Sequence, residues 1–176
     1  MPKPRKALLF LDATPYYHCV SRCVRRAFLY DRDAVTGQDF EHRHQSIVDK
    51  LLTLAGIFAM DVCAYAVLSN HYHVVMHVDR EQAEIWSVTE VIQRWHRLFS
   101  GSRLSQCFLQ QAELSQAERN ELENQVNLWQ QRLMDLSWYM RVANESIARA
   151  ANREDRYTGR FNETFRNLCC CFVFHG

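Results

Sequence analysis

The chain has 176 residues, of which 48% are hydrophobic and 23% are charged. This length and composition are typical of one globular domain with a sizeable core, and the chain is too short for two full domains. The formal net charge of +1 argues against a non-specific polyanion binder, although it leaves room for a local basic patch.

The sequence also predicts where the protein resides. No apolar run reaches membrane-spanning length, so no membrane partner is expected. The apolar patch at residues 7–11 is shorter than the apolar region of a signal peptide, and Asp12 follows it directly. The seven cysteines are odd in number and show no CxxC spacing, which is typical of reduced thiols. Together these features predict a cytoplasmic protein.

The N-terminal part of the chain reads as a basic arm, residues 1–14, followed by a strand at residues 16–24 that is rich in β-formers. Arg22, Arg25 and Arg26 lie close together, with Phe28 and Tyr30 after them. Such a pattern suits a nucleic-acid strand, because cations contact phosphates and aromatic rings stack on bases. The same pattern also fits solvated arginines beside a core phenylalanine, and the sequence leaves both interpretations open.

A polar loop at residues 31–38 precedes an amphipathic helix predicted over residues 39–59. The apolar residues of this segment recur at intervals of three and four, which predicts a helix with one face packed on a sheet. They are Ile47, Val48, Leu51, Leu52, Ala55 and Phe58.

Residues 61–79 read as two strands joined by a tight turn at Ser69 and Asn70. In the first strand Val62, Ala64, Ala66 and Leu68 share one parity. Because successive side chains of a strand point to opposite faces, His71 and His73 are expected side by side while Tyr72 points into the core. Two imidazoles about 7 Å apart along a strand can converge on one metal ion. A pair of surface histidines on a solvated strand is the alternative.

The remaining pattern is helical. A helix over residues 87–99 would complete the order strand, helix, strand, strand, helix, which is most of a ferredoxin-like βαββαβ layer. Residues 100–114 read as a loop, and a capping box at Ser115 and Glu118 opens a peripheral helix to residue 134. A last helix covers residues 135–152, with inward positions at Leu136, Tyr139, Met140, Ala143, Ile147 and Ala150. The predicted class is therefore α+β, with an antiparallel sheet, helices on one face and extra C-terminal helices.

Three segments carry a family resemblance: Tyr17–Cys23 with Arg26–Leu29, Ala64–Val75, and Trp138–Arg141 with Gly159–Phe161. They resemble the REP-associated tyrosine transposases, which are single-tyrosine HUH transposases of bacterial insertion sequences. The run Ser-Asn-His-Tyr-His-Val at residues 69–74 is the most specific part. The resemblance implies a ferredoxin-like domain over residues 1–161 that cleaves and rejoins single-stranded DNA, often at a hairpin.

The resemblance also implies the site. His71 and His73 would bind a divalent ion, Mg²⁺ or Mn²⁺, and a tyrosine would attack the phosphodiester. Since imidazole is a softer ligand than Mg²⁺ prefers, phosphate and water oxygens must complete the shell, and Mn²⁺ suits the pair at least as well. Arg22, Arg25 and Arg26 become candidates for DNA contact. The protein would act as a monomer or as a homodimer.

The C-terminal segment departs from that family. Its nucleophile lies after the Gly-x-Phe segment on a helix, whereas residues 162–176 here contain no tyrosine and no Asn-Pro. This segment is interpreted as an aberrant or truncated tail, so the catalytic helix is expected to be missing. Among the other tyrosines, Tyr72 points away from the metal face and Tyr139 lies on an apolar stripe. Tyr157, in a polar turn, is the weak remaining candidate.

Three functions follow from these features: an active strand-transfer enzyme, a binding module that recognises hairpin DNA without cutting it, or a non-functional remnant of a mobile element. A metal-dependent hydrolase built on His71, His73 and His77 ranks behind them, because no carboxylate partner stands out. The sequence does not decide whether His18 faces the same site or the core.

Overall fold

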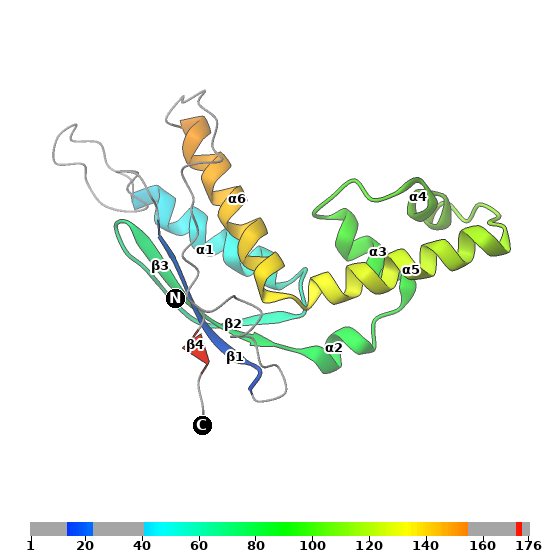
Figure 1. Ribbon diagram of the computed structural model, residues 1–176. Helices are drawn as coiled ribbons and strands as arrows, with labels where there is room; N and C mark the ends of the chain where they lie inside the picture. Colours follow the sequence, from blue (N-terminus) through cyan, green and yellow to red (C-terminus); the bar gives the residue numbers. More distant parts are fainter. Residues whose placement is uncertain (1–13, 23–40, 155–171, 174–176) are drawn as a thin grey trace, which may run out of the picture.

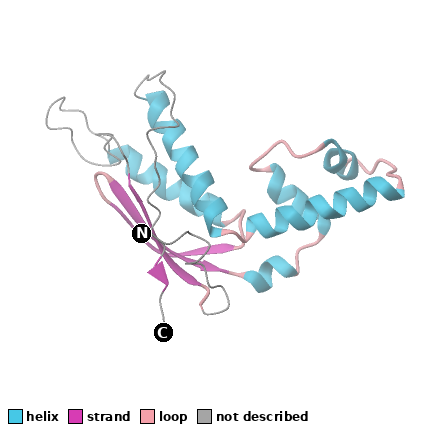
Figure 2. Cartoon of the chain, in the orientation of Figure 1, coloured by secondary structure: helices cyan, strands magenta, loops and turns pink. Residues whose placement is uncertain are grey.

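The fold is an α+β arrangement of one antiparallel sheet and six helices in the described residues (Figures 1 and 2). A computed structural model describes residues 14–22, 41–154 and 172–173. The strands are β1 (Tyr16–Arg22), β2 (Met60–Val67), β3 (His71–Val78) and the two-residue β4 (Phe172–Val173). Their order across the sheet is β2-β3-β1-β4, and all neighbours are antiparallel.

The predicted hairpin is confirmed as β2 and β3 around the turn at Ser69 and Asn70. Strand β3 alternates strictly, with Tyr72, Val74, Met76 and Val78 buried and the intervening residues half-buried. Strand β1 alternates in the same way and buries Tyr17, Cys19 and Ser21. Both strands therefore present one face to the core and one face outward, as period-two patterning requires.

Strand β2 differs from the predicted parity. A β-bulge between Val62 and Ala64 adds one residue to β2, so the side chains before and after it switch faces. Val62 and Val67 pack against the core, whereas Ala64 and Ala66 are exposed. The prediction that Val62, Ala64 and Ala66 share one face is therefore wrong.

Two long helices cover the buried face of the sheet. Helix α1 (Glu41–Ala55) follows β1 as predicted, and α6 (Leu136–Glu154) lies beside it over the sheet (Figure 1). The sequence assigned the second position on the sheet to the helix at residues 87–99, and that assignment is wrong. Helix α6 is the longer helix, and its apolar face, which includes Tyr139, Met140 and Ala143, is almost completely buried.

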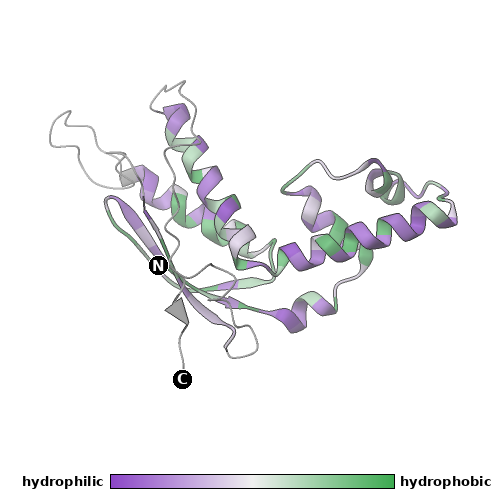
Figure 3. Cartoon of the chain, viewed as in Figure 1, coloured by the Kyte–Doolittle hydropathy of each residue, from purple (hydrophilic) through white to green (hydrophobic). Residues whose placement is uncertain are grey.

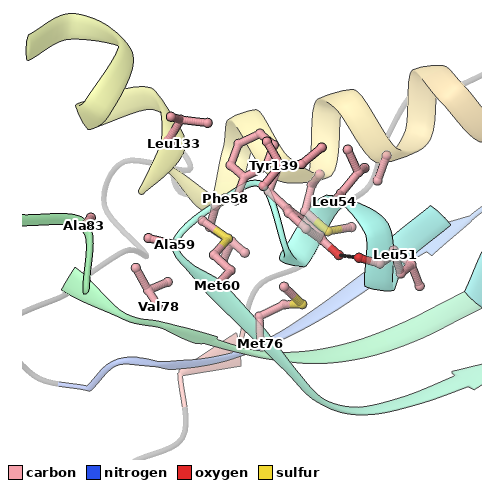
Figure 4. Close-up of a cluster of buried hydrophobic side chains, with 14 of the residues drawn as sticks. Leu51, Leu54, Phe58, Ala59, Met60, Met76, Val78, Ala83, Leu133 and Tyr139 are labelled. Carbon is pink, nitrogen blue, oxygen red and sulfur yellow. Dashed lines mark hydrogen bonds between the residues drawn. The ribbon is translucent and has the colours of Figure 1, made fainter. Parts of the chain in front are cut away.

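The core between α1, α6 and the sheet is held by packing and by buried hydrogen bonds, one of which joins α6 to α1 (Figure 4). The Tyr139 hydroxyl donates to the Leu51 carbonyl at 2.8 Å, and the Phe58 ring meets the Tyr139 ring edge-on with centroids 5.4 Å apart. Two predicted core residues are exposed instead, Leu52 and Ala150, and Leu54 and Ala148 fill the corresponding inward positions.

The helices between β3 and α6 extend away from the sheet (Figure 1). They are α2 (Arg80–Glu84), α3 (Val88–His96), α4 (Arg103–Leu109) and α5 (Gln116–Leu133), so the predicted loop at residues 100–114 contains a helix. Helix α5 is mostly hydrophilic, with a hydrophobic stretch beside α3 (Figure 3). There the Trp95 and Trp129 rings stack at 5.3 Å, and the expected peripheral position of α5 is confirmed.

None of the helices in the described residues combines the length and the apolar character that a membrane span requires.

Candidate metal and nucleic-acid site

The His71 and His73 rings lie next to each other on the half-exposed face of β3. Their centroids are 5.0 Å apart with the rings nearly perpendicular, and both residues are half-buried. Tyr72, between them, points to the opposite face and is buried. The predicted parity is thus confirmed, and the two imidazoles share one surface.

The turn before β3 orients His71. The Nδ1 atom of His71 lies 2.6 Å from the Asn70 side-chain oxygen, and because that oxygen can only accept, Nδ1 carries the proton. The other nitrogen, Nε2, therefore keeps its lone pair. Burial, the neighbouring His73 and the Arg22 guanidinium lower the pKa of His71, which favours the neutral ligand form. A hydrogen bond to the second ring nitrogen is the usual support for a metal-binding histidine.

His18 of β1 contacts the second imidazole. Its Nε2 lies 2.9 Å from Nδ1 of His73, and the two rings are nearly parallel with centroids 5.1 Å apart. If His73 donates this hydrogen bond, its Nε2 is left with a lone pair on the same face as that of His71. The structure thereby places His18 at the site, a position that the sequence left undecided.

A buried polar cluster lies directly behind the histidines. The Ser21 hydroxyl donates to Oδ1 of Asn144 at 2.6 Å, and the Tyr72 hydroxyl donates to the same oxygen at 2.8 Å. Asn144 belongs to α6 and is 2% exposed. One amide therefore ties α6 to both strands that carry the site, at the level of the two imidazoles.

The cations predicted to contact DNA can be placed in part. Arg22 is exposed at the end of β1 and lies opposite His71 in the strand register, so a positive charge stands beside the histidine pair. Arg25, Arg26 and Tyr157 lie outside the described residues, as does the predicted tail except for β4.

His77 occupies the other end of the same face and has different partners. Its Nδ1 donates to Oδ2 of Asp61 at 3.0 Å, and the Tyr16 ring lies against it with centroids 4.8 Å apart. In the described residues no three His, Cys, Asp or Glu side chains gather as a metal site. The hydrolase built on His71, His73 and His77 therefore has no geometric support.

The residues present suit a divalent ion with two protein ligands. Two imidazoles, one of them oriented by Asn70, would leave the rest of a coordination shell to phosphate and water oxygens. Imidazole nitrogen is a better ligand for Mn²⁺ than for Mg²⁺, so the donor chemistry favours Mn²⁺.

Sequence reasoning missed Asn70, Asn144 and the pairing of Asp61 with His77. The bulge explains the last of these. With the unbroken register set by the Ser69–Asn70 turn, Val62 would stand opposite His77, and the extra residue in β2 brings Asp61 there instead.

Comparisons of the chain with protein-family models, with curated proteins and with solved structures found no match.

Proposed function

We propose that this chain binds single-stranded or hairpin DNA in the manner of the REP-associated tyrosine transposases, with a divalent ion on His71 and His73. The observation that carries the proposal is the adjacency of the two imidazoles on an outward face, with centroids 5.0 Å apart. The strand order β2-β3-β1-β4 and the pair of helices on one face support a ferredoxin-like domain. Its place is the cytoplasm, where Cys19, Cys63 and Cys107 stay as free thiols.

Three side chains beside the histidine pair would each contribute to DNA binding. Asn70 keeps the His71 ring in the tautomer that presents Nε2, and His18 contacts the His73 ring at Nδ1, away from its Nε2. Arg22 supplies positive charge for a backbone phosphate beside the pair. When bound, the ion would supply charge neutralisation at a phosphate oxygen.

Binding without cleavage is the activity that we assign. Tyr72 and Tyr139 are buried on the helix side of the sheet. Neither hydroxyl is therefore available to a phosphate on the opposite side, which carries His71 and His73 and is called the histidine face. Residues 162–176 contain no tyrosine. The active strand transferase and the non-functional remnant are the two alternatives, and each gives a different result in the assay below.

A gel shift with hairpin DNA, with and without Mn²⁺, tests the proposal. The wild-type protein should shift the hairpin more strongly with Mn²⁺, and His71→Ala with His73→Ala should remove that dependence. His42→Ala is the matched control, because His42 lies on α1, which covers the opposite face of the sheet, and pairs with Glu154. Absence of any shift would indicate a remnant. A covalent DNA–tyrosine adduct in mass spectra would indicate an active strand transferase.

A further inference from the structure

A second group of side chains crosses the histidine face at its far end. Tyr16 of β1, His77 of β3 and Asp61 of β2 stand opposite one another in the strand register and form one row. Tyr16 is 45% exposed even though its ring lies against His77, with the ring planes 36° apart. Cross-strand packing accounts for the contact with His77, and the exposed fraction of Tyr16 leaves area for a further contact.

The chemistry of this row differs from that of the His71 end. At the His71 end the charged neighbour is the Arg22 guanidinium, which attracts phosphate. At the far end the charged neighbour is the Asp61 carboxylate, which repels phosphate and holds His77 by its Nδ1 proton. The second ring nitrogen of His77, Nε2, takes no part in this hydrogen bond. An aromatic ring beside an oriented imidazole suits a nucleobase, which offers a π-face and hydrogen-bonding edges.

The spacing fits one continuous ligand. His71 and His77 are six residues apart on β3, which is about 20 Å at the strand rise. Stacked nucleotides advance about 3.4 Å each along a strand, so this distance corresponds to about six nucleotides, or fewer in a stretched strand.

From these observations we infer that Tyr16 and His77 form a base-stacking site for single-stranded DNA, whose backbone is held about 13–20 Å away beside His73, His71 and Arg22. The inference rests on the proposed function and adds the path of the strand: along β3, with a base on Tyr16 and phosphate at the histidine pair. The phenol oxygen of Tyr16 has no chemical role in it.

Fluorescence anisotropy with two labelled probes tests the stacking site. One probe is a twelve-residue oligothymidylate, and the other is a twelve-residue abasic strand with the same phosphates and no bases. Tyr16→Ala should weaken binding of the oligothymidylate by about 5- to 150-fold, the range typical of one base–aromatic stack. It should leave binding of the abasic strand within about twofold, because phosphate contacts are unchanged.

Two further variants separate stacking from other roles. Tyr16→Phe keeps the ring and should bind the oligothymidylate like wild type. Tyr65→Ala removes a similarly exposed tyrosine, 47% accessible, that stands opposite buried Val74 and so faces the other side of the sheet. It should have no effect.

The outcomes distinguish this inference from the proposed function. If wild type binds the oligothymidylate and His71→Ala weakens it, but Tyr16→Ala does not, the stacking site is refuted and the proposed function stands. Equal weakening of both probes by Tyr16→Ala also refutes stacking. If wild type binds neither probe, the stacking site is refuted, and the gel shift with hairpin DNA decides the proposed function separately. Circular dichroism of each variant checks that the fold is retained.

Discussion

The buried Asn144 offers a sharp test of how the site is supported. Its Oδ1 accepts hydrogen bonds from Ser21 at 2.6 Å and from Tyr72 at 2.8 Å, while its Nδ2 is buried and makes no hydrogen bond in the described residues. Replacing Asn144 with Leu, a side chain of similar size, removes the shared acceptor. Both hydroxyls then lose the buried acceptor that they share.

The expected loss of stability in Asn144→Leu follows from the two hydroxyls that lose their acceptor. Loss of a buried acceptor costs about 1–3 kcal/mol for each hydroxyl, so the two hydroxyls together cost about 2–6 kcal/mol. Removal of the buried Nδ2, which makes no hydrogen bond in the described residues, offsets about 1–2 kcal/mol of this cost. Asn144→Leu should therefore lower the free energy of unfolding by about 0–5 kcal/mol, with the middle of the range at about 2.5 kcal/mol, measured by urea denaturation with circular dichroism.

A triple variant tests whether Ser21, Tyr72 and Asn144 act as one hydrogen-bonded network. Adding Ser21→Ala and Tyr72→Phe to Asn144→Leu removes the two hydroxyls that lost their shared acceptor. The triple variant should therefore be more stable than Asn144→Leu alone. If the triple variant is instead destabilised by the sum of its single changes, the hydroxyls and the amide do not act as one network. The explanation of how α6 is fixed to β1 and β3 would then fail.

Other predictions concern helix ends, backbone conformation and titration. Ser115→Ala removes the cap that accepts from the Glu118 amide and should cost about 1 kcal/mol in thermal unfolding, whereas Ser137→Ala, which lacks such a role, should cost less. Gly101 has φ +70°, and an added Cβ would lie 2.0 Å from Nε2 of His96, so Gly101→Ala should cost more than 1–2 kcal/mol, roughly the strain of that φ alone. The lowered pKa of His71 means that its proton is released below the ordinary value near 6.5. Stability contributed by neutral His71 is therefore complete above about pH 6.5 and declines as the pH falls below it, and an NMR titration of its ring protons that gave a pKa above 6.5 would contradict this.

The β2–β3 hairpin could be predicted because its information is local. Strict alternation around the Ser69–Asn70 turn fixes the side of the sheet on which His71 and His73 emerge. The start of α5 was equally readable, since the Ser115 cap and Glu118 form a reciprocal hydrogen-bonded box. In these segments the pattern and the final structure agree because no tertiary contact competes with them.

The arrangement of the helices could not be predicted in the same way. The segments that became α3 and α6 both carry an apolar stripe, and periodicity does not say which stripe packs on the sheet. The choice depends on long-range fit: Tyr139 reaches the Leu51 carbonyl, whereas Trp95 stacks on Trp129 of α5.

The candidate site shows the same division between local and non-local information. The shared face of His71 and His73 follows from parity, but the contact of His18 with His73 depends on how β1 aligns with β3. The pairing of Asp61 with His77 depends on a bulge, which no residue pattern in β2 signals. Non-local register therefore determines which side chains accompany the two histidines.

The central claim is that a divalent ion binds to the imidazoles of His71 and His73 when DNA is present. Pulsed electron paramagnetic resonance of Mn²⁺ with the protein and hairpin DNA measures it directly, because a coordinating imidazole nitrogen couples to the ion. Wild type and His42→Ala should show ¹⁴N coupling, and the double variant His71→Ala, His73→Ala should lose it. Identical coupling in the double variant, or none in wild type with bound hairpin, would contradict the claim.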